Sequence, residues 1–200
     1  MIEAAVEELR AGRPVVLPTD TVYGLCADPY REAPVRELYR IKGRPPEQPT
    51  ALLVRDVEFL LECVPELRGR AATLARALLP GPFTLILPNQ AQRYRWLTGS
   101  SPDTIGVRIP RLSGPGGEVL ERVGALAATS ANHHGGPDPR RLDDVPVEIR
   151  ASAAAVVDGG ELPGTPSTVL DLTGPEPQVV REGAVPAAEA LERVLAATTG

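Results

Sequence analysis

Apolar residues along the chain recur at helical spacing in some segments and in short continuous runs in others. Ile2, Val6 and Leu9 share one face of a predicted opening helix, which ends at Gly12. The run 15–17 is typical of a buried strand that Pro18 closes. The other predicted strands cover residues 51–54, 83–87, 104–109, 125–129 and 155–157, and a hairpin joins 168–172 to 178–181.

Helices are predicted between these strands. One predicted helix carries Val35–Tyr39, a second follows a cap at Asp56, a third runs through Leu74–Leu79 and a fourth covers Val119–Val123. The last predicted helix starts at Pro186 and buries Leu191, Val194 and Leu195. Segments 113–117 and 135–139 are predicted as flexible loops, too short to divide domains. This rhythm indicates an α/β fold, with a mixed parallel and antiparallel sheet and flanking helices in a single domain over residues 1–200.

The composition is that of an ordinary globular protein and excludes several kinds of chemistry. A net charge of -5 and 4% aromatic residues argue against general attraction to nucleic acid or an anionic membrane. Two separated cysteines and two adjacent histidines, His133 and His134, provide no zinc site. We find no apolar run of about 20 residues, so we expect a cytoplasmic protein without a membrane span.

Common catalytic motifs are missing from the sequence. It has no phosphate-binding Gly-x4-Gly-Lys-Ser/Thr loop, no Gly-x-Gly-x-x-Gly and no Gly-x-Ser-x-Gly. An enzyme with this sequence would work by positioning its substrates and stabilising charge, as in phosphoryl or nucleotidyl transfer. The chain has a single lysine, Lys42, among twenty arginines, which hints that a compact ammonium is needed there.

Polar residues gather where predicted elements end. Thr19, Asp20 and Thr21 follow the strand 15–17, and Lys42 and Arg44 follow a helix on a proline-rich loop. The first group suits a ligand at a strand end, but it also suits an ordinary Asx turn. The two cations suit a polyphosphate, but they also suit the dipole at a helix C-terminus.

Three further groups extend this pattern. The strand 125–129 leads into a Ser-x-Asn segment at 130–132, which could bind a sugar or phosphate or simply cap a turn. Arg108 interrupts an apolar strand and needs an anionic partner, either a ligand or an internal carboxylate, unless it faces solvent. The segment 166–171 and Arg181 supply more hydroxyls and another strand-end cation.

Taken in order, these segments resemble the YrdC-type threonylcarbamoyl-AMP synthases. The resemblance covers about residues 13–183, and its motifs are Pro-Thr-Asp-Thr-Val-Tyr-Gly-Leu at 18–25, Lys-x-Arg-Pro at 42–45, Pro-Gly-Pro-Phe-Thr at 80–84, Val-Arg-x-Pro at 107–110, Ser-x-Asn at 130–132 and Ser-Thr-Val-x-Asp at 167–171. It implies a twisted mixed α/β sheet around a concave pocket, in a short member of the family.

The resemblance also implies an activity. Such an enzyme forms threonylcarbamoyl-AMP and pyrophosphate from L-threonine, bicarbonate and ATP with Mg²⁺, and partner proteins transfer the threonylcarbamoyl group to tRNA. The implied ATP-binding residues are Lys42, Arg44, Gln48, Thr104, Ser130, Asn132, Asp138 and Arg181, with Lys42 and Arg44 also catalytic. The implied threonine-binding residues are Thr21, Arg108, Ser167 and Thr168, and no side chain is assigned as a protein metal ligand.

Three departures from the family pattern keep other interpretations open, the first being Thr-Ala-Leu-Leu at 50–53 in place of the usual Leu-rich start of that strand. Gln48 stands where Asn is common, and Asp138 replaces a hydroxyl near the expected phosphates, where it could hold magnesium or mark altered nucleotide use. One alternative is a paralogue that makes a different carbamoyl-adenylate. Another is a non-catalytic protein of ribosome assembly that contacts RNA directly, which the net charge of -5 disfavours.

Overall fold

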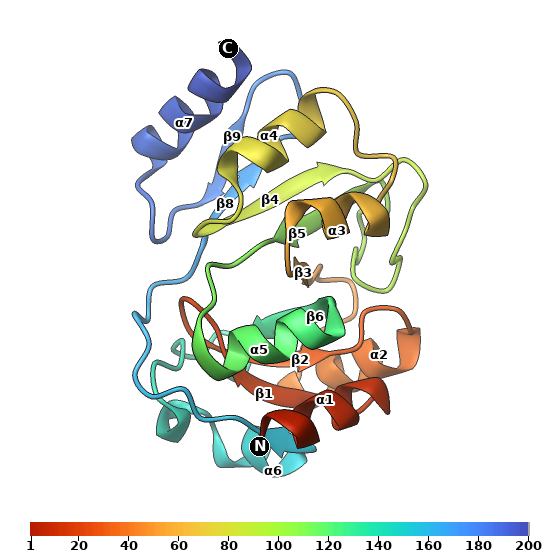
Figure 1. The fold of residues 1–200 in the computed structure, drawn as a ribbon, viewed down its shortest axis with the longest axis vertical. Helices are drawn as coiled ribbons and strands as arrows, with labels where there is room; N and C mark the ends of the chain where they lie inside the picture. The colour runs from red at the N-terminus through yellow and green to blue at the C-terminus, as the bar shows by residue number, and fades with distance from the viewer. Residues whose placement is uncertain (200) are drawn as a thin grey trace.

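The computed structural model describes residues 1–199, which form a mixed α/β fold (Figure 1). The helices are α1 (Ile2–Arg10), α2 (Glu32–Lys42), α3 (Val57–Cys63), α4 (Arg70–Leu78), α5 (Gly114–Val123), α6 (Val147–Ser152) and α7 (Ala187–Thr199), with a short 3-10 helix, η1 (Leu142–Asp144), before α6. The strands are β1 (Val15–Pro18), β2 (Tyr23–Ala27), β3 (Ala51–Val54), β4 (Phe83–Pro88), β5 (Thr104–Arg108), β6 (Ala125–Ser130), β7 (Ala155–Val156), β8 (Thr168–Asp171) and β9 (Gln178–Arg181).

All nine strands found in residues 1–199 join one sheet, in the order β7-β1-β2-β6-β3-β5-β4-β8-β9. The pairs β1–β7, β3–β5 and β4–β8 are parallel, and the other neighbouring pairs are antiparallel. The mixed sheet predicted from the sequence is therefore confirmed. Its two ends form the lower and upper parts of the molecule in Figure 1.

Helices cover both faces of the lower part of the sheet. Val15 and Leu17 of β1 pack in one cluster with α1 and α5, whereas Val16 between them packs in a second cluster with α2. Successive side chains of a strand point to opposite faces, so this short run serves both clusters. Full burial of an aliphatic side chain contributes about 1.5–3 kcal/mol, which makes the two clusters the main source of stability here.

The upper part of the sheet has one apolar face and one mixed face. Along β4, Phe83, Leu85 and Leu87 are buried in the cluster that includes residues of α4 and α7. Thr84 and Ile86 alternate with them and line a cavity on the other side. The strand that anchors the upper helices therefore also supplies part of the cavity wall.

Four sequence predictions differ from the structure. The segment 113–117 is not a flexible loop, because α5 begins at Gly114. A Cβ at Gly116 would lie 2.0 Å from the Pro18 carbonyl oxygen, so close packing, rather than flexibility, explains that glycine. The strand β2 and the helix α6 were not predicted. Leu195 was expected in the core but is 57% exposed on the outer side of α7.

The helices of residues 1–199 are all too short or too polar to span a bilayer.

Candidate active site

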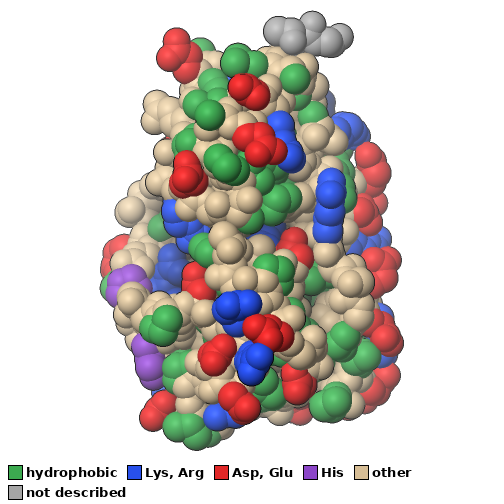
Figure 2. Space-filling view, turned by 90° about the vertical axis from the view of Figure 1, so that its left-hand side faces the viewer, with side chains coloured by type: hydrophobic (Ala, Val, Ile, Leu, Met, Phe, Trp, Pro, Cys, Tyr) green, Lys and Arg blue, Asp and Glu red, His purple; other side chains and the backbone are tan. Residues whose placement is uncertain are grey.

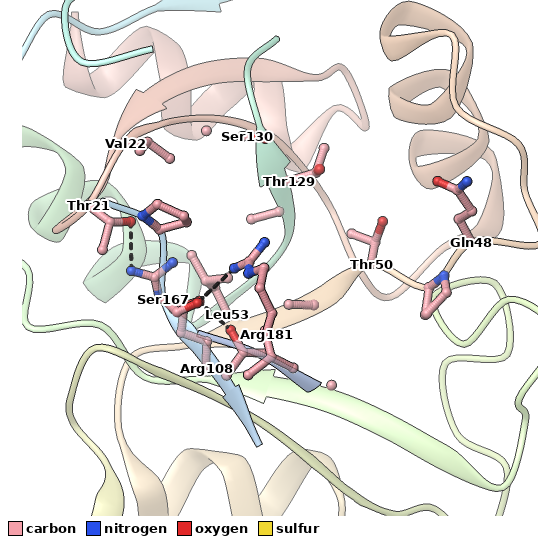
Figure 3. A pocket seen from close by; sticks show the side chains of 18 of the residues that line it. Thr21, Val22, Gln48, Thr50, Leu53, Arg108, Thr129, Ser130, Ser167 and Arg181 are labelled. Atoms are coloured by element: carbon pink, nitrogen blue, oxygen red, sulfur yellow. Dashed lines mark hydrogen bonds between the residues drawn. The ribbon is translucent and has the colours of Figure 1, made fainter. Parts of the chain in front are cut away.

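A cavity of about 570 Å³ lies between the two parts of the sheet. Strands β2 to β6, β8 and β9 contribute to its wall, together with the turns that follow β1 and β6 and the loop after α2. Figure 3 shows Thr21, Arg108, Ser167 and Arg181 gathered at one end of the cavity and Thr50 and Gln48 at the other. This volume falls within the range of small-molecule sites.

Lys42 is the last residue of α2 and only 4% exposed. Gly43 ends the helix in the left-handed conformation, with φ of +65°, and the chain turns there toward the cavity. The ammonium donates to the Ser130 carbonyl oxygen at 2.6 Å, the Asn132 carbonyl oxygen at 3.0 Å and Asn132 Oδ1 at 2.6 Å. These acceptors are neutral, so the hydrogen bonds hold the turn after β6 without cancelling the positive charge of Lys42.

Burial lowers the pKa of Lys42 to about 8, and the positive charge of Arg44 acts in the same direction. The negative charge of Asp138, which also lines the cavity, opposes this shift. Asp138 is half-buried. The opposite charges of Lys42 and Asp138 therefore interact electrostatically within the cavity.

Arg44 adds a second cation beside Lys42. It donates from Nη1 to Thr129 Oγ1 at 3.1 Å and from Nη2 to the Pro49 carbonyl oxygen, and burial lowers its pKa. Within residues 1–199, its buried Nε has no hydrogen-bond partner. Gln48 Nε2 lies 3.5 Å from His134 Nε2, so the loop after α2 meets the loop after β6 at the cavity. We refer to Lys42, Arg44, Ser130 and Asn132 as the lysine end.

Arg108 lies at the end of the cavity where Figure 3 shows it with Thr21 and Ser167, and it is 8% exposed. Its Nη2 forms an ion pair with Asp20 Oδ1 and donates to Thr21 Oγ1 at 2.9 Å. Burial lowers the pKa of Arg108, the charge of Arg181 adds to this shift, and Asp20 opposes it. Arg108 thus has an internal carboxylate partner, one of the alternatives left open by the sequence.

Ser167 and Arg181 complete this end. Arg181 Nη2 donates to the Ser167 carbonyl oxygen at 2.8 Å, and the hydroxyls of Ser167 and Thr84 are 2.8 Å apart. We refer to Thr21, Arg108, Ser167 and Arg181 as the arginine end; Arg181, which the resemblance assigns to ATP, lies here beside residues that the resemblance assigns to threonine.

Thr168 does not reach the cavity, contrary to what the resemblance implies. Ser167, Val169 and Asp171 line the cavity, whereas Thr168 is fully buried on the opposite face of β8. Its hydroxyl donates to the Val185 carbonyl oxygen at 2.6 Å and accepts from the amides of Gly183 and Val185. Adjacent residues of a strand point to opposite faces, so Ser167 and Thr168 cannot both contact one ligand.

The structure brings the other expected site residues to the cavity wall: Thr21, Lys42, Arg44, Gln48, Thr104, Arg108, Ser130, Asn132, Asp138, Ser167 and Arg181. It also adds residues that the sequence prediction left out, among them Thr84, Thr129 and Asp171. The alternation along the segment 167–171 could have revealed Asp171, because it shares a strand face with the expected site residue Ser167. No expected site residue lies on β4, so the sequence offered no such signal for Thr84.

The surface outside the cavity has a different charge pattern. On the face shown in Figure 2, Lys and Arg side chains alternate with Asp and Glu side chains and do not form one large basic patch. Many of the exposed arginines are paired with carboxylates, such as Arg36 with Glu32 and Arg93 with Glu66. On this face, the charges are therefore mixed, whereas Lys42, Arg44, Arg108 and Arg181 all line the cavity.

Comparisons with known proteins agree with this geometry. The Sua5/yciO/yrdC family model, described as "Telomere recombination", matches residues 7–183. A Pyrococcus abyssi protein named "Threonylcarbamoyl-AMP synthase" is 36% identical over 197 residues, which cover 97% of this chain and 57% of that protein. A protein of the same name from Pseudomonas syringae is 35% identical over 191 residues, covering 91% of this chain and 97% of that protein.

A solved structure gives the same result in three dimensions. The crystal structure of P. abyssi Sua5 complexed with L-threonine superposes with a TM-score of 0.87 at 34% identity. The superposition covers 96% of this chain and 56% of the Sua5 chain. The present chain therefore spans a little over half of the P. abyssi protein and nearly all of the P. syringae protein.

Proposed function

The chain belongs to the Sua5/YciO/YrdC family, and from this premise we propose that it is a threonylcarbamoyl-AMP synthase. It joins L-threonine, bicarbonate and ATP to give threonylcarbamoyl-AMP, pyrophosphate and water. The relatives that carry this name are 31–36% identical to the chain in the examples from P. abyssi, P. syringae and Bacillus subtilis. A partner protein then transfers the threonylcarbamoyl group from this product to an adenosine of tRNA.

The observation that carries the proposal is the distribution of cations in the cavity. Lys42 and Arg44 line the cavity beside the end of β6, where they donate to Ser130, Asn132 and Thr129. Arg108 and Arg181 line it where Figure 3 shows them gathered with Thr21 and Ser167. A polyphosphate and an amino-acid carboxylate are two anions that must be brought together against their mutual repulsion. A single cavity with a cationic group at each end meets this requirement.

The lysine end binds the phosphates of ATP. Lys42 contributes a point charge and Arg44 a planar donor group, the two kinds of cation that phosphate sites use. The neutral acceptors around Lys42 leave its charge available, and a phosphate oxygen takes the place of one of them, such as the Asn132 carbonyl oxygen at 3.0 Å. Ser130, Gln48 and Thr104 supply neutral hydrogen-bonding groups for the rest of the nucleotide.

The arginine end binds threonine. The guanidinium of Arg108 holds the carboxylate, and the hydroxyls of Thr21 and Ser167 lie beside it for the polar groups of the amino acid. The threonine amine then points along the cavity toward the phosphates.

The reaction needs no nucleophilic side chain. Bicarbonate gives carbon dioxide and hydroxide, and the threonine amine takes up the carbon dioxide and loses a proton to become a carbamate; the proton and the hydroxide form the water that is released. A carbamate oxygen then attacks the α-phosphorus of ATP. The bond from that phosphorus to the bridging oxygen breaks, and pyrophosphate leaves with the electron pair. Lys42 and Arg44 stabilise the charge that develops on the phosphate oxygens, which is the main contribution that an active site makes to such transfers.

Asp138 would be the residue of this chain that holds the magnesium ion of Mg-ATP. It fits this role, because its half-buried carboxylate lines the cavity and carboxylate oxygen is a preferred magnesium ligand. When bound, Mg²⁺ supplies further neutralisation of the phosphate charge.

The decisive test is pyrophosphate release from Mg-ATP in the presence of bicarbonate, with and without L-threonine. We expect release that depends on threonine, and Lys42→Ala should lower its rate by about 10²–10³-fold. The matched control is Arg40→Ala, which removes an exposed cation of the same helix that pairs with Glu37, and should retain the wild-type rate.

Two outcomes would contradict the proposal. Pyrophosphate release that is the same without threonine would indicate a different reaction. Release that is faster with serine or another amino acid than with threonine would indicate a paralogue that makes a different carbamoyl-adenylate.

A further inference from the structure

Asp20 lies in the turn between β1 and β2, beside the arginine end. Its side chain is 12% exposed and uses both of its carboxylate oxygens. Oδ1 pairs with Nη2 of Arg108, and Oδ2 accepts the backbone N–H of Arg111 at 3.0 Å. One carboxylate thus fixes both the guanidinium at the end of β5 and the backbone three residues later.

The ion pair leaves part of the Arg108 guanidinium available. Asp20 and Thr21 both bind Nη2. Within residues 1–199, the buried Nε of Arg108 has no hydrogen-bond partner, and the hydrogen bonds of this side chain to the protein involve Nη2. A buried donor without a partner is costly, so the free protein holds a guanidinium that is oriented but not satisfied.

The charges at this end leave room for one more anion. Arg108 and Arg181 are close enough that the charge of Arg181 lowers the pKa of Arg108. Asp20 pairs with one of these two guanidinium groups, and Asp171, the other carboxylate on this strand face of the cavity, is hydrogen-bonded to Thr173, with no ion pair to either arginine among the described residues. Arg181 therefore has no carboxylate in direct contact within residues 1–199. A single amino-acid carboxylate matches the charge that Arg181 adds.

We propose that Asp20 is the positioning residue of the threonine site, which holds Arg108 in the orientation that receives the substrate carboxylate. This inference rests on the proposed function. The role of Asp20 as a positioning group can be distinguished from that of a plain counter-charge, because the two have opposite effects on threonine affinity. Removing a counter-charge would strengthen the attraction of the site for a carboxylate. Removing a positioning group weakens binding, because the guanidinium must be ordered when threonine binds.

The test measures the KM values for threonine and ATP separately in Asp20→Asn, which keeps the shape of the side chain and removes its charge. We expect the KM for threonine to rise about 10–100-fold, the range for loss of a buried charge-assisted contact. The KM for ATP should change by less than about threefold, because the lysine end is untouched. Isothermal titration of the unreacted protein with L-threonine gives the same comparison without catalysis.

The chain offers a closely matched control in Asp28→Asn. The Asp28 side chain is 14% exposed, pairs with Arg31 and accepts the backbone N–H of Tyr30 at 2.9 Å. It therefore repeats the chemistry and burial of Asp20 at a place that does not line the cavity. Asp28→Asn should retain both KM values.

Asp20→Glu covers the case in which Asp20→Asn does not fold. Glutamate keeps the charge but displaces it by one methylene group, so positioning predicts weaker threonine binding in a folded protein. The inference is overturned if Asp20→Asn binds threonine as tightly as the wild type or more tightly, if threonine and ATP affinities fall together, or if Asp20→Glu equals the wild type. Failure of the proposed function would be seen separately, as a wild-type protein that releases no threonine-dependent pyrophosphate.

Discussion

The two ends of the cavity hold a buried cation in two different ways. Lys42 is 4% exposed and surrounded by neutral oxygens of Ser130 and Asn132. Arg108 is 8% exposed and paired with Asp20. Removal of a cation from water is costly in both cases, but only the arginine end offsets that cost with an opposite charge in direct contact.

This difference indicates two binding strategies. At the lysine end, burial lowers the pKa of Lys42 to about 8, so the charged form of Lys42 is destabilised in the free protein. A bound polyanion would stabilise that charged form. At the arginine end, Asp20 balances the charge of Arg108 by direct contact and contributes orientation, while Arg181 adds a further positive charge. The first arrangement favours strong attraction to a highly charged ligand, and the second favours recognition of a ligand with one charge in a defined pose.

The contrast predicts a large difference in stability between two variants. Arg108→Met leaves Asp20 as a buried carboxylate without its cation and should lower the free energy of unfolding by about 3–5 kcal/mol. Lys42→Met leaves only neutral oxygens unpaired and should lower it less, by about 1–3 kcal/mol. Urea denaturation of both variants measures the difference.

Arg36→Met is the control for this pair, because Arg36 and Glu32 form an exposed ion pair on α2 and its loss should cost less than about 1 kcal/mol. Equal losses for Arg108→Met and Lys42→Met would show that Asp20 does not distinguish the two ends.

A second prediction uses pH to act on the lysine end alone. Because the pKa of Lys42 is about 8 in the free protein, its ammonium is lost above that pH. A nearby triphosphate raises that pKa, so the affinity for ATP should fall by about tenfold per pH unit above pH 8. The free energy of unfolding should instead rise with pH from about 8 to 10.5. In that range the unfolded chain, with the ordinary lysine pKa of 10.5, binds more protons than the folded chain.

Equilibrium binding of a non-hydrolysable ATP analogue from pH 7 to pH 10 checks this expectation. Lys42→Arg keeps its charge over the whole range and should bind with an affinity that does not depend on pH, although more weakly than the wild type at pH 7. A steep decline in that variant would assign the pH dependence to another group.

The sequence predicted those parts of the molecule that depend on local patterns. The apolar runs placed most strands, and the strand-end hydroxyls and cations of Thr21, Lys42 and Ser130 all line the cavity. The strand β2 was missed because it is buried along its whole length and follows directly on the polar turn, so no alternation marks it.

Long-range contacts were beyond the reach of these patterns. Asp20 and Arg108 are 88 residues apart, and nothing in the spacing of either segment identifies the other as its partner. The segment 113–117 was assigned to a loop from its glycines, whereas the close approach of α5 to β1 at Gly116 is a tertiary requirement. Only the assembled sheet shows which of the candidate groups meet.

The smallest effect on substrate binding is expected at the adjacent residues Ser167 and Thr168, which the strand geometry assigns to opposite faces of β8. Thr168→Val removes a hydroxyl with three hydrogen bonds to residues 183–185 and should lower the free energy of unfolding by about 1–3 kcal/mol, with no change in the KM for threonine. Ser167→Ala should do the reverse, raising that KM by about 3–10-fold with little loss of stability, because its hydroxyl faces the cavity beside Thr84. Steady-state kinetics and urea denaturation of both variants decide the matter. If Thr168→Val, still folded, loses threonine affinity as Ser167→Ala does, then both residues serve the arginine end and the assignment of faces along β8 is wrong.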